Sequence, residues 1–147
     1  MMEKVKGTIK PLPAVELEGT EKQVKWASEI RAKAANVLLQ ECVLREQYEV
    51  TNMLPGGKTE IKSRPVQRII EALKSEEGIK AYLESLPDFL VESTIKSMND
   101  ALDRYARFAE IMSNSSAKFW IDNRDNQEPN YMFMLFKQYI NTGVKRF

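Results

Sequence analysis

Residues 87–112 read PDFLVESTIKSMNDALDRYARFAEIM and contain the clearest helical pattern in the chain. Apolar side chains recur there at steps of three and four residues, at Ile95, Met98, Leu102, Tyr105, Ala109 and Met112. This heptad spacing predicts a helix with one continuous buried seam. Pro87 suits the first position of that helix, because proline has a fixed φ and needs no amide partner there. The chain is therefore expected to be mainly α-helical, as a multi-helix bundle.

A long N-terminal helix is predicted upstream, from Glu21 to about Tyr48. Thr20 and Gln23 match a capping box, in which each side chain bonds a backbone N–H of the helix start. No glycine or proline interrupts the segment. Its apolar residues recur mostly at helical steps, at Val24, Ala27, Ile30, Ala34, Val37, Leu38, Val43 and Leu44. Charges of both signs lie between them, so the opposite face is expected to be solvated.

The pattern changes between these two helices. Residues 53–58 contain a Pro-Gly-Gly turn, and residues 59–62 alternate weakly, so the segment is either a loop or a short β-ribbon around 50–63. Shorter helices are predicted at about 63–73, 75–86, 117–124 and 131–140.

Three segments are expected along the chain. Prolines and glycines make residues 1–19 a flexible arm, residues 20–124 form the helical core domain, and residues 125–147 form a C-terminal helical extension. We see neither a signal peptide nor about 18 consecutive apolar residues, so a cytoplasmic protein without a membrane partner is expected.

The composition excludes several kinds of chemistry. The chain has no histidine and one cysteine, so it offers neither an internal disulfide nor a Cys/His zinc site. Cys42, flanked by leucines and a valine, is expected to be a small core residue. With 22 basic and 21 acidic residues the net charge is +1, so any nucleic-acid contact needs a local patch. We predict no catalytic residue, metal site or cofactor, and hence no enzyme.

Two groups of residues are candidate binding surfaces. The first is a basic segment running from the turn into the next helix, Lys58, Lys62, Arg64 and Arg68, opposed only by Glu60. It suits a nucleic-acid backbone or an acidic protein groove, and an ordinary solvated loop is the alternative. The second is the last helix, which is more apolar than one buried stripe requires. Homodimer contact or simple burial would explain its residues Tyr131, Phe133, Phe136 and Tyr139.

Two further stretches carry a family resemblance: LEGTEKQVKWASEIR at residues 17–31 and SAKFWIDNR at residues 116–124. Together they resemble a poorly characterised helical domain of Firmicutes and of their phages and mobile elements, over residues 17–124. The resemblance implies a helical core and a phage or mobile-element setting, and it brings no catalytic residue. Many relatives carry a cysteine-rich segment resembling a zinc ribbon before this domain. This chain lacks it, so nucleic-acid roles suggested by the ribbon do not carry over.

Within these motifs Trp26 and Trp120 are expected to pack together in the core, because large aromatic side chains dominate core energetics. An ion pair is expected at the edge of this core. Its guanidinium would come from Arg31 or Arg124, and its carboxylate from Asp122 or Glu29.

The leading hypothesis is a non-enzymatic phage or mobile-element protein that binds a host or phage protein. One form of it is an inhibitor of a host defence protein such as a CRISPR effector nuclease, acting in the cytoplasm of the host cell. The alternative is a small nucleic-acid-binding accessory protein that uses the basic segment 58–68.

Overall fold

The computed structural model describes residues 5–12, 14–44, 47–53, 59–64, 66–123 and 133–147, and it confirms a mainly helical fold. The helices are α1 (Glu21–Leu38), α2 (Val66–Ala72), α3 (Glu76–Glu84), α4 (Asp88–Met112), α5 (Ala117–Asp122) and α6 (Met134–Thr142). A π-helical turn, η2 (Leu39–Val43), follows α1 directly. Strands β1 (Gln47–Met53) and β2 (Thr59–Arg64) pair antiparallel, with an irregularity between Val50 and Asn52.

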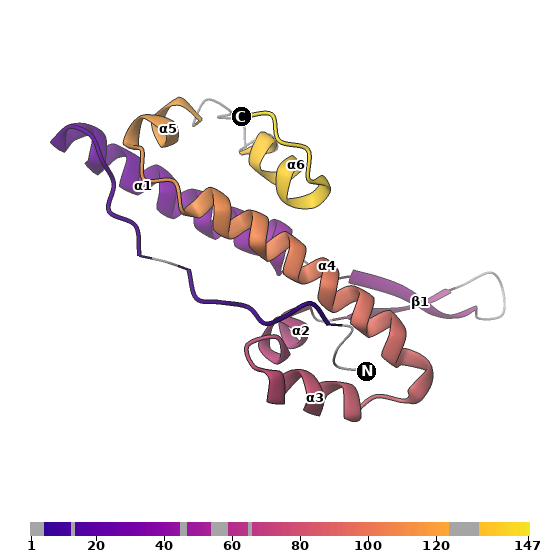
Figure 1. The fold of residues 1–147 in the computed structure, drawn as a ribbon. Helices are drawn as coiled ribbons and strands as arrows, with labels where there is room; N and C mark the ends of the chain where they lie inside the picture. Colours follow the sequence, from indigo (N-terminus) through magenta and orange to yellow (C-terminus); the bar gives the residue numbers. More distant parts are fainter. Residues whose placement is uncertain (1–4, 13, 45–46, 54–58, 65, 124–132) are drawn as a thin grey trace.

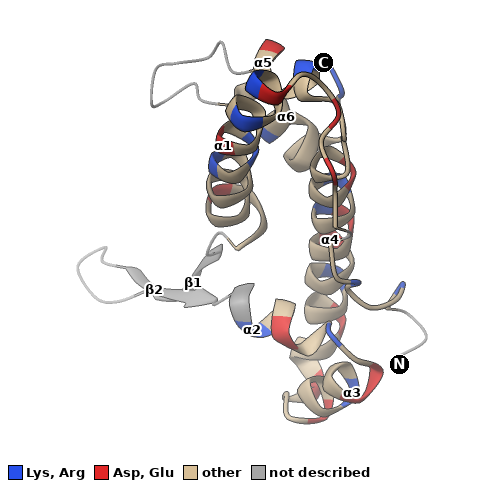
Figure 2. Ribbon diagram, turned by 90° about the vertical axis from the view of Figure 1, so that its left-hand side faces the viewer, with Lys and Arg blue, Asp and Glu red and all other residues tan. Residues whose placement is uncertain are grey.

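Two long helices run through most of the molecule (Figure 1). Figure 2 shows α1 and α4 as two roughly parallel columns, with α5 and α6 at one end and α2 and α3 at the other. We call these the α5–α6 end and the α2–α3 end. Helix α1 packs on α5, α4 packs on α6 and η2, and α2 packs on α3 and α4. The pair of strands projects sideways from this frame (Figure 1).

Helix α1 begins where the sequence predicts, but it ends earlier. The backbone N–H of Gln23 donates to the Thr20 hydroxyl at 3.2 Å, and the Thr20 N–H donates to the Gln23 side chain at 3.0 Å, which completes the capping box. The predicted continuation to Tyr48 is wrong. The last turn widens so that the N–H of Leu44 bonds the carbonyl of Leu39, and β1 already begins at Gln47.

Two other helix starts differ by a few residues. The helix predicted from Ser63 begins at Val66, because Ser63 pairs with β1 as part of β2. Pro87 is the N-cap of α4 rather than its first helical residue. The backbone of Ser63 pairs with strand β1, and the backbone dihedral angles of Pro87 are not helical. Neither residue therefore belongs to the helix that follows it.

The buried face of α4 also differs from the predicted seam. Ile95, Met98 and Met112 are buried as expected, whereas Leu102, Tyr105 and Ala109 are only half-buried. Ala101, Arg104 and Phe108 are buried in this part of the helix instead. A straight helix drifts relative to a strict heptad, and α4 contacts α2, η2 and α6 at different points along its length.

Aromatic rings fill the α5–α6 end of the molecule. Phe136 of α6 lies 5.6 Å from Phe119, 5.8 Å from Trp120 and 4.9 Å from Phe147 between ring centroids. Phe133 and Phe136 are 5% and 1% exposed. For these two residues the structure therefore shows burial within the chain, and a second copy could reach them only by displacing α6. Tyr139 is half-buried, and Tyr131 lies outside the described residues.

The two tryptophans have different surroundings, contrary to the expected core pair. Trp120 is fully buried and its indole N–H donates to the Asn114 carbonyl at 3.0 Å. Trp26 is 45% exposed on α1. Helix α1 needs only small or aliphatic residues on its buried face, at Ala27, Ala34 and Leu38.

The expected pairing of Arg31 with a carboxylate is also wrong. Its Nη2 and Nε donate to the carbonyl of Met112, at 2.7 and 3.2 Å. The guanidinium thus supplies hydrogen bonds to a carbonyl at the C-terminal end of α4, where unpaired carbonyls attract positive charge. Arg107 does the same for α6, because its Nη1 donates to the Ile140 carbonyl at 2.9 Å. Arg124 lies outside the described residues.

The N-terminal segment runs extended from one end of the molecule to the other (Figure 1). The Ile9 N–H donates to the Leu73 carbonyl at 2.8 Å, beside α2. The Glu18 N–H donates to the Ser115 carbonyl at 2.7 Å, and the Ala117 N–H donates to the Glu18 carbonyl at 3.0 Å, beside α5. The hydrophobic core includes residues of all three segments expected from the sequence, from Val5 to Ile140.

Candidate functional site

The basic segment spans β2 and the start of α2. Lys62 and Arg64 lie in β2, opposite Glu49 and Gln47 of β1 in the strand register. Arg68 lies in the first turn of α2 and its side chain is exposed. Lys58 lies outside the described residues. Arg68 is thus the member of the segment whose surroundings can be described.

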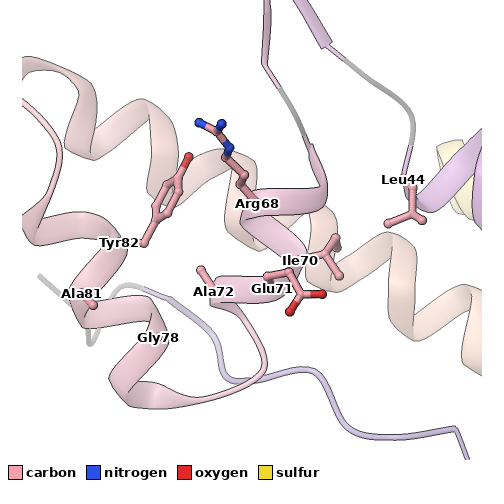
Figure 3. Close-up of a pocket in the computed structure, with 8 residues that line it drawn as sticks. All are labelled: Leu44, Arg68, Ile70, Glu71, Ala72, Gly78, Ala81 and Tyr82. Carbon is pink, nitrogen blue, oxygen red and sulfur yellow. The ribbon is translucent and has the colours of Figure 1, made fainter.

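Arg68 stands at an open groove of about 890 Å³ between α2 and α3, which we call the α2–α3 groove (Figure 3). Its lining is mainly apolar. The residues that line it are Leu44, Arg68, Ile70, Glu71, Ala72, Gly78, Ala81 and Tyr82.

Local sequence explains how the two short helices meet. Ser75 caps α3 by accepting the Gly78 N–H at 2.9 Å. A side chain at Gly78 would place its Cβ 2.6 Å from the Ala72 carbonyl oxygen, so only glycine allows this close approach. Behind the groove, Leu73 and Ile79 are buried and hold the helix pair on the core. The tight turn before α3 therefore sets how closely α2 and α3 approach each other at the groove.

The polar groups of the groove are arranged on two sides. Figure 3 shows the Arg68 guanidinium and the hydroxyl end of Tyr82 pointing the same way, and the Glu71 carboxylate pointing oppositely. Glu71 pairs with Lys74, whose Nζ lies 2.8 Å from its Oε1. The described part of the chain contains no ion pair of Arg68. One guanidinium and one hydroxyl are thus available to an anionic or acceptor group beside an apolar floor.

A second exposed group lies at the same end of the molecule. Phe89, in the first turn of α4, is 81% exposed, the highest value among the large apolar side chains that the structure describes. Single exposed apolar residues are common, so Phe89 by itself defines no site. Its position nevertheless adds apolar surface to the α2–α3 end.

The lining of the α2–α3 groove contains few reactive side chains among the described residues. Nucleophilic catalysis needs a nucleophile next to a base, and the described residues that line the groove do not include such a pair. Among the described residues, no three His, Cys, Asp or Glu side chains are grouped to hold a metal ion. Cys42 is buried, as the sequence predicts. Within the same residues, no helix is both long and apolar enough to cross a bilayer.

Sequence reasoning identified Arg68 but missed the groove. Tyr82 was given no role in a site from the sequence, although it is half-buried and lines the groove. Gly78, three residues after the Ser75 cap, is the one sequence signal of a close helix approach.

Comparison of the chain with protein-family models, with curated proteins and with solved structures found no match. The function must therefore be argued from the chemistry of the surface itself.

Proposed function

We propose that the protein acts without catalysis, by binding a partner protein through the α2–α3 groove. The observation that carries this proposal is the open apolar groove with Arg68 and Tyr82 on one side of it. Arginine and tyrosine are the side chains most often responsible for binding energy at protein interfaces, together with tryptophan.

The groove chemistry defines the kind of segment that would bind. Ile70, Ala72 and Ala81 offer an apolar floor for aliphatic side chains. The guanidinium of Arg68 would pair with a carboxylate of the partner, because Arg–carboxylate pairs combine charge with directed hydrogen bonds. We expect an amphipathic segment with an acidic residue one turn from its apolar residues.

The family resemblance adds a setting to this proposal. If the chain is a phage or mobile-element protein, its partner is a host protein, and a defence protein such as a CRISPR effector nuclease is the form we favour. Inhibition would follow from occupying a surface that the nuclease needs. A phage product would meet that partner in the host cytoplasm.

Affinity purification from host extract with paired variants tests the proposal. The wild-type protein should retain one stoichiometric partner, and Arg68→Glu should lose it. Lys96→Glu, the same charge change on α4, is the control and should retain it, because Lys96 is exposed and does not line the groove.

Titration of the purified partner then gives the decisive measurement. Arg68→Glu and Tyr82→Ala should each weaken binding at least roughly 30-fold, the effect of losing a hot-spot residue of about 2 kcal/mol. Unchanged affinity for both variants would contradict the groove as the contact site.

Nucleic-acid binding by the basic segment is the second candidate function. The specific observation in its favour is that Lys62, Arg64 and Arg68 follow one another through β2 and α2, and that Arg68 is exposed. Replacing these three residues and Lys58 by alanine should then reduce the dependence of affinity on salt. Tyr82→Ala should leave that dependence unchanged, so the two functions can be separated.

A further inference from the structure

Phe89 is an aromatic side chain that its own molecule leaves in water. It lies in the first turn of α4 and is 81% exposed. Leaving such a ring uncovered is costly, because an aromatic side chain buries about 150–250 Å² when it is covered. Phe89 is not among the residues that line the α2–α3 groove of its own molecule. A cover for this ring would therefore have to come from another molecule.

The α2–α3 groove has the chemistry to receive an aromatic ring. Ile70, Ala72 and Ala81 form part of its apolar lining, and Tyr82 adds an aromatic ring beside them. Two aromatic rings attract each other in edge-to-face and offset arrangements. The Arg68 guanidinium points to the same side as the hydroxyl end of Tyr82 (Figure 3). A ligand that carries a ring next to a carboxylate would therefore match both parts of the groove.

The chain itself carries this combination at the start of α4. Asp88 directly precedes Phe89, and its side chain is exposed. Among the described residues, no ion pair involves Asp88, and none involves Arg68. A carboxylate and a guanidinium pair well, because charge and directed hydrogen bonds act together. The charge beside Phe89 is thus complementary to the charge of the groove.

We propose that the α2–α3 groove binds a second copy of this chain, with Phe89 of one copy on the apolar lining and Asp88 paired with Arg68. Both surfaces lie at the same end of the molecule, since α4 begins shortly after α3 ends (Figure 2). A two-fold axis between the copies would form each contact twice, once in each direction. This is the arrangement of an isologous dimer.

The dimer should be weak and reversible. Two Phe89 rings account for only part of the roughly 1,200–2,000 Å² that a stable interface buries, since one aromatic side chain contributes about 150–250 Å². We therefore expect monomers on dilution and dimers at high protein concentration.

Self-association would also regulate the groove. A dimer occupies the surface that the host partner needs, so the partner would bind the monomer and would compete with the second copy. This consequence rests on the function proposed above, whereas the dimer is formed by the purified chain alone and can be measured without any partner.

Sedimentation velocity over a concentration series from the low micromolar to the submillimolar range tests the proposal. The wild-type protein should shift from monomer to dimer, and Phe89→Ala should raise the dissociation constant at least roughly tenfold. Met134→Ala is the matched control and should leave the dissociation constant unchanged. Met134 is also a large apolar residue in the first turn of a helix and is 46% exposed, but it lies at the α5–α6 end.

An exchange of the two charges identifies the contact directly. Asp88→Arg and Arg68→Asp should each abolish self-association, because each variant places like charges opposite each other. An equimolar mixture of the two variants should form a one-to-one heterodimer, because every contact then joins an arginine to an aspartate again. Recovery in the mixture also shows that both variants are folded.

Three results would overturn the proposal. They are a wild-type protein that stays monomeric over the whole series, a dimer that Phe89→Ala does not weaken, and a mixture of the two charge variants that stays monomeric. The function proposed above fails on a different result, namely host-partner binding that Arg68→Glu and Tyr82→Ala leave unchanged. Phe89→Ala separates the two, because it should weaken the dimer and leave the groove open to the host partner.

Discussion

The two ends of the molecule use aromatic residues in opposite ways. At the α5–α6 end, Phe136 lies among the rings of Phe119, Trp120 and Phe147, and Phe136 and Trp120 are almost completely buried. At the α2–α3 end, Tyr82 lines an open groove and Phe89 is exposed.

The difference comes from what covers each end. Helix α6 and the residues after it fold back onto α5, and the Phe147 ring closes over Phe119, Phe136 and Tyr139. Within the described residues, no comparable element closes the α2–α3 groove. One end thus stabilises the fold, and the other leaves apolar and aromatic surface exposed.

The largest expected effect is that of removing the central ring of the filled end. Phe136→Ala should lower the free energy of unfolding by about 3–5 kcal/mol, because it leaves a cavity among packed aromatic rings. Tyr82→Ala, the matched aromatic deletion at the open end, should cost less than about 1 kcal/mol. Urea unfolding of the two variants measures the contrast, and equal losses would show that the two ends do not differ.

An intermediate effect is expected at the turn that shapes the groove. Gly78→Ala should destabilise the protein by about 1–2 kcal/mol, because the new Cβ would lie 2.6 Å from the Ala72 carbonyl oxygen. The better helix propensity of alanine offsets part of this cost.

Gly7→Ala is the control for this change, because a Cβ there would meet nothing within 4 Å. Its free energy of unfolding should stay within about 0.5 kcal/mol of the wild-type value. Similar thermal unfolding of both glycine variants would mean that α2 and α3 are not held in close contact.

The smallest expected effect is pH-dependent and concerns the packing of α6 on α4. The pKa of Tyr139 is raised above its usual value of 10.0, chiefly by the hydrogen bond with Glu110, then by burial and by the Glu110 charge, while Arg107 opposes the shift. Since the folded state favours the neutral hydroxyl, its stabilisation is complete below pH 10 and is lost as the pH rises through the raised pKa.

Comparing the wild-type protein with Tyr139→Phe tests this sign. Below pH 9 the variant should be less stable by about 0.5–1 kcal/mol, since it lacks one half-exposed hydrogen bond. The difference should shrink as the pH passes 10. Glu110→Gln should remove most of this pH dependence, and a difference that grows with pH would contradict the assignment.

Several features could be predicted from the sequence because they depend on residues close together in the chain. The Thr20 capping box, the Ser116 cap of α5 and the stop at Gly143, whose φ is 80°, each involve residues within about one helical turn. Helical periodicity predicted the mainly helical class, and the apolar neighbours of Cys42 predicted its burial.

Other features were decided only by tertiary structure, since they bring together residues far apart in the chain. Arg31 donates hydrogen bonds to the carbonyl of Met112, which lies 81 positions further along the chain. No local pattern could show that this guanidinium caps the C-terminal end of α4 instead of pairing with a carboxylate. Which tryptophan is buried depends on α6, whose Phe136 packs on Trp120 and leaves Trp26 outside. The groove beside Arg68 likewise exists only because α2 and α3 meet at Gly78.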